Sequence, residues 1–98
     1  MGKLKGYVGT WANIRCEYIK EHEPDFYQFM LRSNNLDSYL IDYQTMYQTQ
    51  ANALHERLAK ERGVDDRLQE KDVFEWIIQT EQIQEDVRRE ITALINKN

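Results

Sequence analysis

The chain has 98 residues, of which 41% are hydrophobic and 31% charged, and its formal net charge is −4. A chain of this length folds as one domain, and its composition is typical of a soluble globular protein rather than a disordered or membrane-spanning one. Cys16 is the only cysteine, which excludes an internal disulfide bond and suits a reducing cytoplasm. Residues 1–11 lack the apolar segment of a secretory signal, so we expect a cytoplasmic protein.

The first part of the chain predicts a tail followed by two short helices. Residues 1–9 hold three glycines and two lysines, and we expect them to form a flexible tail. Thr10 is placed to cap a first helix over residues 11–22. Pro24 occupies a favoured first-turn position of a second short helix, which we expect to end near Ser33.

The longest predicted element is a helix over residues 36–62. Its apolar residues recur every three or four positions, so they line one face of the helix. They are Leu36, Leu40, Tyr43, Tyr47, Ala51, Leu54 and Leu58. Gly63 follows directly and is the residue type that most often ends a helix, with Val64 placed to pack back on the last turns.

The last part of the chain predicts a short turn and a second long helix. Asp65 is placed to cap one helical turn that runs through Leu68. Asp72 and Glu75 have the spacing of a capping box at the start of a helix that we expect to reach about Ile95. Its apolar stripe consists of Val73, Ile77, Thr80, Ile83, Val87, Ile91 and Leu94. Because about ten residues join them, the two long helices are expected to be antiparallel.

These elements predict an all-α fold, with a single helical domain over residues 10–98. The domain is a small helical bundle with two long antiparallel helices and two short N-terminal helices. We expect eight side chains in its core: Leu40, Tyr47, Leu54, Leu58, Ile77, Ile83, Val87 and Ile91.

The residues that usually carry catalysis or bind metals do not form a recognisable motif in this sequence. His22 and His55 have no zinc-ligand spacing around them, and neither belongs to the Glu-x-x-His pair of a di-metal bundle. A phosphate-binding loop and a nucleophile elbow are also missing. A catalytic role for Cys16 would need a histidine paired with it in space. We therefore expect a protein that is not an enzyme and has no catalytic, cofactor-binding or metal-binding residues.

Two apolar features predict binding surfaces. Residues 44–55 carry no formal charge unless His55 is protonated, and interfaces are depleted in charge and enriched in Tyr and Met. The residues that fit this pattern are Tyr43, Met46 and Tyr47. This stretch predicts a homodimer or partner interface; the alternative is that the first two helices cover it. Phe74 and Ile78 lie off the main stripe of the last helix. These two side chains are covered either by a third helix of the same chain or by a partner.

An acidic segment is the third candidate surface. Residues 63–98 contain five basic and nine acidic residues, which supply the whole negative excess. An acidic chain repels nucleic acid at long range, and we expect these side chains to face a basic partner surface. The alternative is a solvated face that keeps the protein soluble. The candidate residues are Asp65, Asp66, Glu70, Asp72, Glu81, Glu85 and Asp86.

From residue 18 onward, a series of short stretches and single positions follows the pattern of one protein family: Tyr18-Ile19-Lys20-Glu21-His22, Tyr27, Leu31, Ser33, Leu36, Ser38-Tyr39-Leu40, Arg62-Gly63-Val64, Leu68, Glu75-Trp76 and Glu90-Ile91. On these positions the sequence resembles the TnpV family of transposon-encoded proteins. The resemblance extends from roughly Gly6 to Ile91. It departs from the family at Asn34-Asn35, where a glycine-containing turn is usual, and at a shortened amino terminus.

The resemblance implies a protein carried on a bacterial mobile element, and it transfers no catalytic residues. Small proteins on such elements include inhibitors of host defence, among them type II-A anti-CRISPR proteins that are small, acidic and non-enzymatic. By this analogy we expect an anti-CRISPR-like inhibitor in the cytoplasm of the bacterial host cell. It would bind a type II CRISPR effector nuclease, or its guide complex, and block guide RNA or target DNA loading.

Two alternatives remain from the sequence. The first is a DNA-binding accessory protein of the transposon, which would need a basic helix face. The basic residues nearest to such a face are Arg57, Lys60, Arg62 and Arg67. The second is a helical assembly protein that acts only through its surface.

Overall fold

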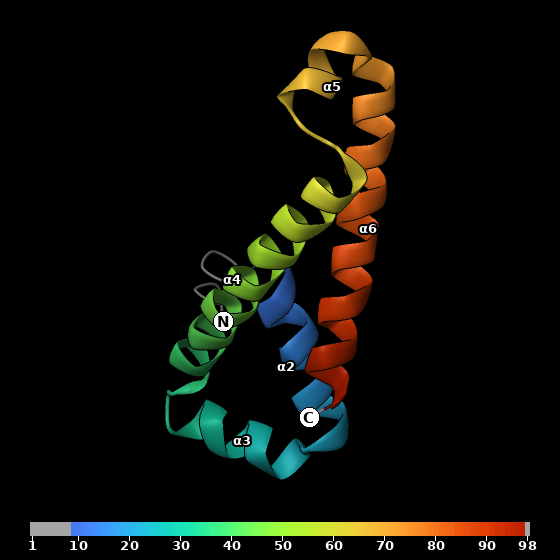
Figure 1. The fold of residues 1–98 in the computed structure, drawn as a ribbon. Helices are drawn as coiled ribbons and strands as arrows, with labels where there is room; N and C mark the ends of the chain where they lie inside the picture. Colours follow the sequence, from blue (N-terminus) through green and yellow to red (C-terminus); the bar gives the residue numbers. More distant parts are fainter. Residues whose placement is uncertain (1–8, 98) are drawn as a thin grey trace.

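The computed structural model describes residues 9–97, and all regular secondary structure in this range is α-helical (Figure 1). The helices are α2 (Thr10–His22), α3 (Pro24–Arg32), α4 (Leu36–Arg62), α5 (Asp66–Lys71) and α6 (Val73–Lys97). The predicted all-α bundle is therefore confirmed. The tail expected over residues 1–9 lies, except for Gly9, outside the described residues.

The two long helices run in opposite directions and form a narrow V (Figure 1). α4 and α6 approach each other near α5, which packs against α6 beyond the end of α4. At the other end they diverge, and α2 packs against both of them in the space between. α3 joins α2 to α4 across the open end (Figure 1). We call the part formed by the turn after α4, α5 and the first turns of α6 the hairpin tip.

Two clusters of buried side chains hold this arrangement together. The larger lies between α2, α4 and α6 and contains Trp11, Tyr47, Ala51, Val64, Ile83, Val87, Ile91 and Ile95. The smaller lies between α2, α3 and the start of α4 and contains Ala12, Cys16, Ile19, Tyr27, Leu36 and Leu40. α2 contributes to both clusters, so it couples the long hairpin to the N-terminal end of the bundle.

The turn chemistry read from the sequence is confirmed at the tip. Gly63 has a φ of 67°, the left-handed conformation that glycine adopts without strain, and the Val64 amide donates to the Ala59 carbonyl at 2.8 Å. The Asp65 carboxylate accepts from the Leu68 amide at 3.0 Å and so caps α5. The Asp72 carboxylate accepts from the Glu75 amide at 3.1 Å.

The start of α2 differs from the prediction. Gly9 is the N-cap residue and Thr10 is already helical, so the Thr10 side chain does not cap the helix. One backbone N–H of the first turn finds its acceptor on another helix instead: the Ala12 amide donates to Oε1 of Gln44 on α4 at 3.0 Å. A tertiary contact has replaced the local cap.

The apolar stripe of α6 was predicted correctly only in its middle. Ile83, Val87 and Ile91 are buried, but Ile77 is 41% exposed and Leu94 is 42% exposed. Ile77 is exposed because α4 ends before it reaches this turn of α6, where only the short α5 lies alongside. Near its C-terminal end α6 packs on α2, where the Ile95 carbonyl accepts from Arg15, and Ile95 rather than Leu94 is buried. Two further predicted core residues, Leu54 and Leu58, are partly buried.

Candidate partner-binding surface

The uncharged stretch of α4 is largely explained within the chain, because α2 packs against it. Besides the Gln44 cap, Nε1 of Trp11 donates to Oε1 of Gln48 at 2.9 Å. Nε2 of Gln48 then donates to Oδ1 of Asn52 at 2.9 Å, which extends a row of side-chain amides along α4. Amides suit this position because they can both donate and accept at a partly buried junction. The covering of this stretch by the first helices is therefore the better of the two sequence interpretations.

The tyrosines and methionine predicted as an interface have different surroundings. Tyr47 is buried in the larger core cluster, and its ring stacks on Tyr43, which is partly buried. Met46 is exposed. Of these three residues, only Met46, at 44% exposed, is therefore accessible enough to contact a partner.

Arg15 is the one charged residue among the buried side chains described, and the sequence analysis did not identify it. It is 6% exposed, its Nε donates to the Tyr39 hydroxyl at 3.0 Å, and one of its terminal nitrogens donates to the Ile95 carbonyl at 3.4 Å. The guanidinium also lies over the rings of Tyr18 and Tyr43, at 5.0 and 4.8 Å from their centres. These contacts tie α2 to α4 and to the end of α6, so Arg15 has a structural role.

Cys16, next to Arg15 in the sequence, is buried in the smaller core cluster. Burial raises the pKa of its thiol, which disfavours the thiolate that a nucleophile needs. The environment of Cys16 is that of a small apolar core residue.

The first turns of α6 carry four of the eight large hydrophobic side chains that are exposed among the described residues. Phe74 is 75% exposed and Ile78 is 58% exposed, and both lie beside the exposed Val73 and Ile77. α5 packs on α6 without covering these side chains, so the alternative of cover by a further helix of the chain does not hold within residues 9–97. Contiguous exposed apolar side chains on a small domain are typical of an interaction site.

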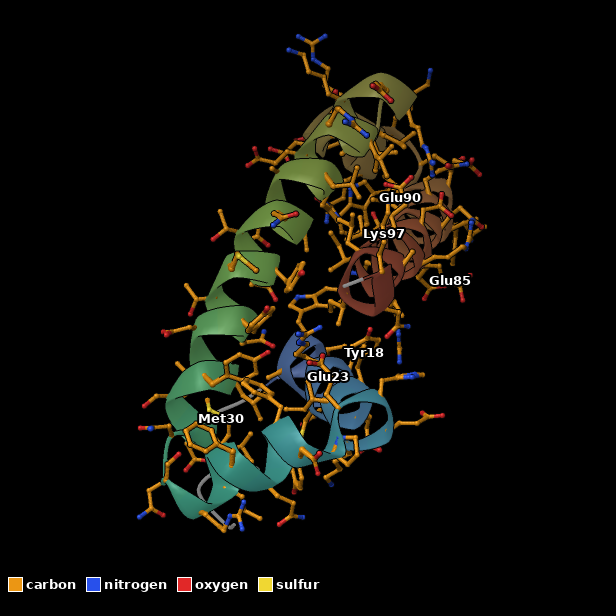
Figure 2. All side chains as sticks on the ribbon, turned by 90° about the horizontal axis from the view of Figure 1, so that it is seen from below. Tyr18, Glu23, Met30, Glu85, Glu90 and Lys97 are labelled. Carbon is orange, nitrogen blue, oxygen red and sulfur yellow. The ribbon has the colours of Figure 1, made fainter. Side chains whose placement is uncertain are left out.

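Two acidic residues continue the same face of α6. Phe74, Ile78, Glu81 and Glu85 follow one another at spacings of four, three and four, which places them on one side of a helix. We call these four residues the outer stripe. At about 100° per residue, Phe74 lies half a turn from the buried Ile83. Figure 2 shows Glu85 on the side of α6 that faces away from α4.

The outer stripe borders a hollow in the protein surface. The hollow has a volume of about 550 Å³ and is lined by Ile78, Glu81, Gln82, Gln84, Glu85 and Arg88. Its wall thus combines one apolar side chain and two carboxylates with two amides and the guanidinium of Arg88. Such a mixed surface can accept an apolar group and a cation side by side.

The seven acidic residues predicted as a binding surface divide into three groups. Asp65 and Asp72 cap helices, as described above. Asp86 accepts from Arg62 at 2.7 Å and from Arg89 at 3.0 Å, and the Arg62 hydrogen bond lowers the pKa of its carboxyl. Four acids are exposed and form no ion pair among residues 9–97: Asp66, Glu70, Glu81 and Glu85. These four are the acids of the set that neither cap a helix nor form an ion pair in this range, so a partner can bind them without disturbing the fold.

The basic residues near Gly63 are partly neutralised. Arg62 is bound to Asp86, and Nε of Arg57 lies 3.9 Å from a carboxylate oxygen of Glu61. Lys60 and Arg67 are exposed. This arrangement does not form the basic helix face that DNA binding requires.

Neither a metal site nor a membrane-spanning helix is present among the described residues. Among residues 9–97, no three His, Cys, Asp or Glu side chains are grouped closely enough to hold a metal ion. No helix in the same range is long and apolar enough to span a membrane.

The fold and this surface define a small all-α protein built on a long helical hairpin, with an exposed apolar and acidic face at the tip. The chain belongs to the family of transposon-encoded proteins TnpV, because the model of that family matches residues 2–95. The family resemblance read from the sequence is therefore confirmed. The chain matched no curated protein and no solved structure.

Proposed function

We propose that this transposon-encoded protein acts without catalysis, by binding a basic surface of a protein partner through the carboxylates of α5 and α6. The observation that carries the proposal is the set of four exposed acids without an ion-pair partner in the described chain, Asp66, Glu70, Glu81 and Glu85. Asp66 and Glu70 lie on α5 at the hairpin tip, and Glu81 and Glu85 follow along α6 as far as its middle, so negative charge extends from the tip along the first half of α6. Unpaired charge concentrated on one surface raises the rate of encounter with an oppositely charged surface.

The partner that we propose is a type II CRISPR effector nuclease or its guide complex, with guide RNA or target DNA loading as the blocked step. A channel that holds phosphates is positively charged, and carboxylates are attracted by the same potential. The choice of this partner rests on genetic context, because a protein encoded on a transposon enters cells that defend themselves against mobile DNA.

The test is cleavage of target DNA by a purified type II effector with its guide RNA, in the presence of this protein. A variant with Glu70→Lys, Glu81→Lys and Glu85→Lys should lose inhibition. Asp65 and Asp72 are left unchanged because both cap helices. The matched control carries Glu21→Lys, Asp42→Lys and Glu56→Lys, which are exposed acids elsewhere and produce the same change in net charge.

The control should inhibit as well as the wild type, and both variants should keep the helical far-ultraviolet spectrum. Inhibition should also weaken as salt rises, because the Debye length falls from about 10 Å at 0.1 M to about 3 Å at 1 M. Failure of the wild type to inhibit type II effectors would remove the proposed partner. Equal inhibition by the two charge variants would remove the acidic surface from the mechanism.

The two alternatives from the sequence give different results in simple binding assays. A DNA-binding accessory protein would shift duplex DNA in a gel without any nuclease present, at low salt. An assembly protein or the predicted homodimer would show a concentration-dependent mass in sedimentation. The motive for the homodimer is weaker than the sequence indicated, since α2 covers much of the uncharged stretch.

A further inference from the structure

We propose that the outer stripe of α6 is a docking site for an amphipathic basic helix of the partner. This inference rests on the proposed function and goes further, because it names the kind of partner segment and adds an apolar anchor to the acidic surface. The segment would place apolar side chains against Phe74 and Ile78 and lysines or arginines against Glu81 and Glu85.

The apolar half of the site is Phe74 and Ile78, flanked by Val73 and Ile77. An exposed phenylalanine is large enough to act as the anchor of an interface, where a few large side chains carry most of the binding energy. These residues are one turn apart on a helix, so they match apolar residues one turn apart on a second helix. A helix laid along α6 would therefore bury them in the way that α4 buries the inner face.

The charged half of the site adjoins the apolar half. Ile78, Glu81 and Glu85 line the same surface hollow, so an apolar contact and a cation contact can be made by one segment. The stripe from Phe74 to Glu85 extends about 16 Å along the helix axis, which is about three turns. A single partner helix of three to four turns is long enough to cover it.

The charge of the surroundings decides between the candidate occupants. Residues 65–89 contain eight acidic and four basic residues, of which Arg88 lines the hollow, so the surroundings are acidic overall. A second copy of the chain on this face would set like charge against like, which costs binding energy. Nucleic acid and anionic membranes are repelled for the same reason. A basic amphipathic segment of a protein is the occupant that satisfies both the apolar and the acidic residues.

The probe for this site is a fluorescently labelled, alanine-rich helical peptide. It carries two leucines one turn apart and two lysines two and three turns beyond the first leucine, so that its side chains match the outer stripe. A second peptide has the same residues in the reverse order, because the bound helix can run in either direction along α6. One control peptide replaces the lysines with glutamates and another replaces the leucines with alanines.

Fluorescence anisotropy at low ionic strength should show binding of one of the two matched peptides to the wild-type protein. Phe74→Ala should weaken this binding about tenfold or more. Phe29→Ala is the matched control, because Phe29 is 59% exposed on α3 and lies outside the acidic segment. It should leave the Kd unchanged. Both side chains are exposed, so neither substitution should unfold the protein.

Several outcomes would overturn the proposal. These are no binding of either matched peptide, equal binding of the leucine-to-alanine peptide, and equal weakening by Phe29→Ala and Phe74→Ala. A wild-type dimer in sedimentation that Phe74→Ala dissociates would make a second copy the occupant. The proposed function is tested separately, because inhibition of the nuclease without peptide binding keeps that function and removes this site. Peptide binding without inhibition of the nuclease keeps this docking site and removes the proposed function.

Discussion

Replacing Arg15 with alanine should destabilise the protein more than any change to an exposed charge. The guanidinium is buried, and its contacts join three helices: α2, on which it lies, α4 through Tyr39 and Tyr43, and the end of α6 through Ile95. The Ile95 carbonyl belongs to the last turn of α6, where backbone acceptors have no partner within the helix. Removal of the side chain leaves this carbonyl and the Tyr39 hydroxyl without their donor.

The magnitude follows from these contacts. A hydrogen bond that involves a charged group contributes about 1.5 to 3 kcal/mol. Each contact of the guanidinium with a tyrosine ring adds about 0.5 to 1 kcal/mol. The cost of removing a charge from water offsets part of the sum, so we expect the free energy of unfolding to fall by about 3 kcal/mol. A domain of this size has a total stability of about 5 to 15 kcal/mol.

Urea unfolding followed by circular dichroism at 222 nm measures this loss. Arg15→Lys should lie between wild type and alanine, because lysine keeps the charge but has no planar group to bond Tyr39 and Ile95 together. Arg32→Ala is the control, since Arg32 is exposed at the end of α3. A loss below about 1 kcal/mol for Arg15→Ala, or a loss equal to that of Arg32→Ala, would refute a structural role for this cluster.

Three further predictions concern the core, the tip and the tyrosines. Leu40→Ala should cost about 2 to 5 kcal/mol and Leu54→Ala less, as measured by urea unfolding, because Leu40 is fully buried and Leu54 only partly. Gly63→Ala should lower stability in the same assay by about 1 kcal/mol, because the strain of a φ of 67° is then the only cost and no atom lies in the way of the new methyl group. Burial raises the pKa of Tyr39 to about 12. The neutral Tyr39 therefore makes a contribution to the free energy of unfolding that is fully present below pH 10 and is lost as the pH rises towards 12. Absorbance titration of the tyrosines at 295 nm should show this late ionisation, and Tyr39→Phe should remove it.

Most of the helix boundaries could be predicted because each is set by one or two neighbouring residues. Gly63, Asp65 and Asp72 act through the conformation or the hydrogen bonds of their own turn, and Pro24 fixes the first turn of α3. The buried middle of α6 could also be predicted, because the spacing of its apolar residues is a property of the helix alone. Local signals of this kind need no knowledge of the rest of the fold.

The errors arose where another element decides the outcome. Arg15 lies on the buried face of α2, but a charged residue on a short helix gives no sign in the sequence that tyrosines from α4 will surround it. The exposure of Ile77 depends on where α4 stops relative to α6, which periodicity cannot reveal. Phe74 and Ile78 were identified as a candidate surface because they departed from the stripe, and the structure leaves them exposed.

The cap that Gln44 gives to α2 has a consequence for the order in which a newly made chain can fold. α2 is synthesised before Gln44, which follows Ala12 by 32 residues. At the usual rates of translation this interval lasts a few seconds. A helix of 13 residues is marginally stable alone in water, and this one has no side-chain cap of its own. We therefore expect α2 to remain largely unfolded at the ribosome until the first half of α4 has emerged, so the N-terminal helix is not the nucleus on which this chain assembles.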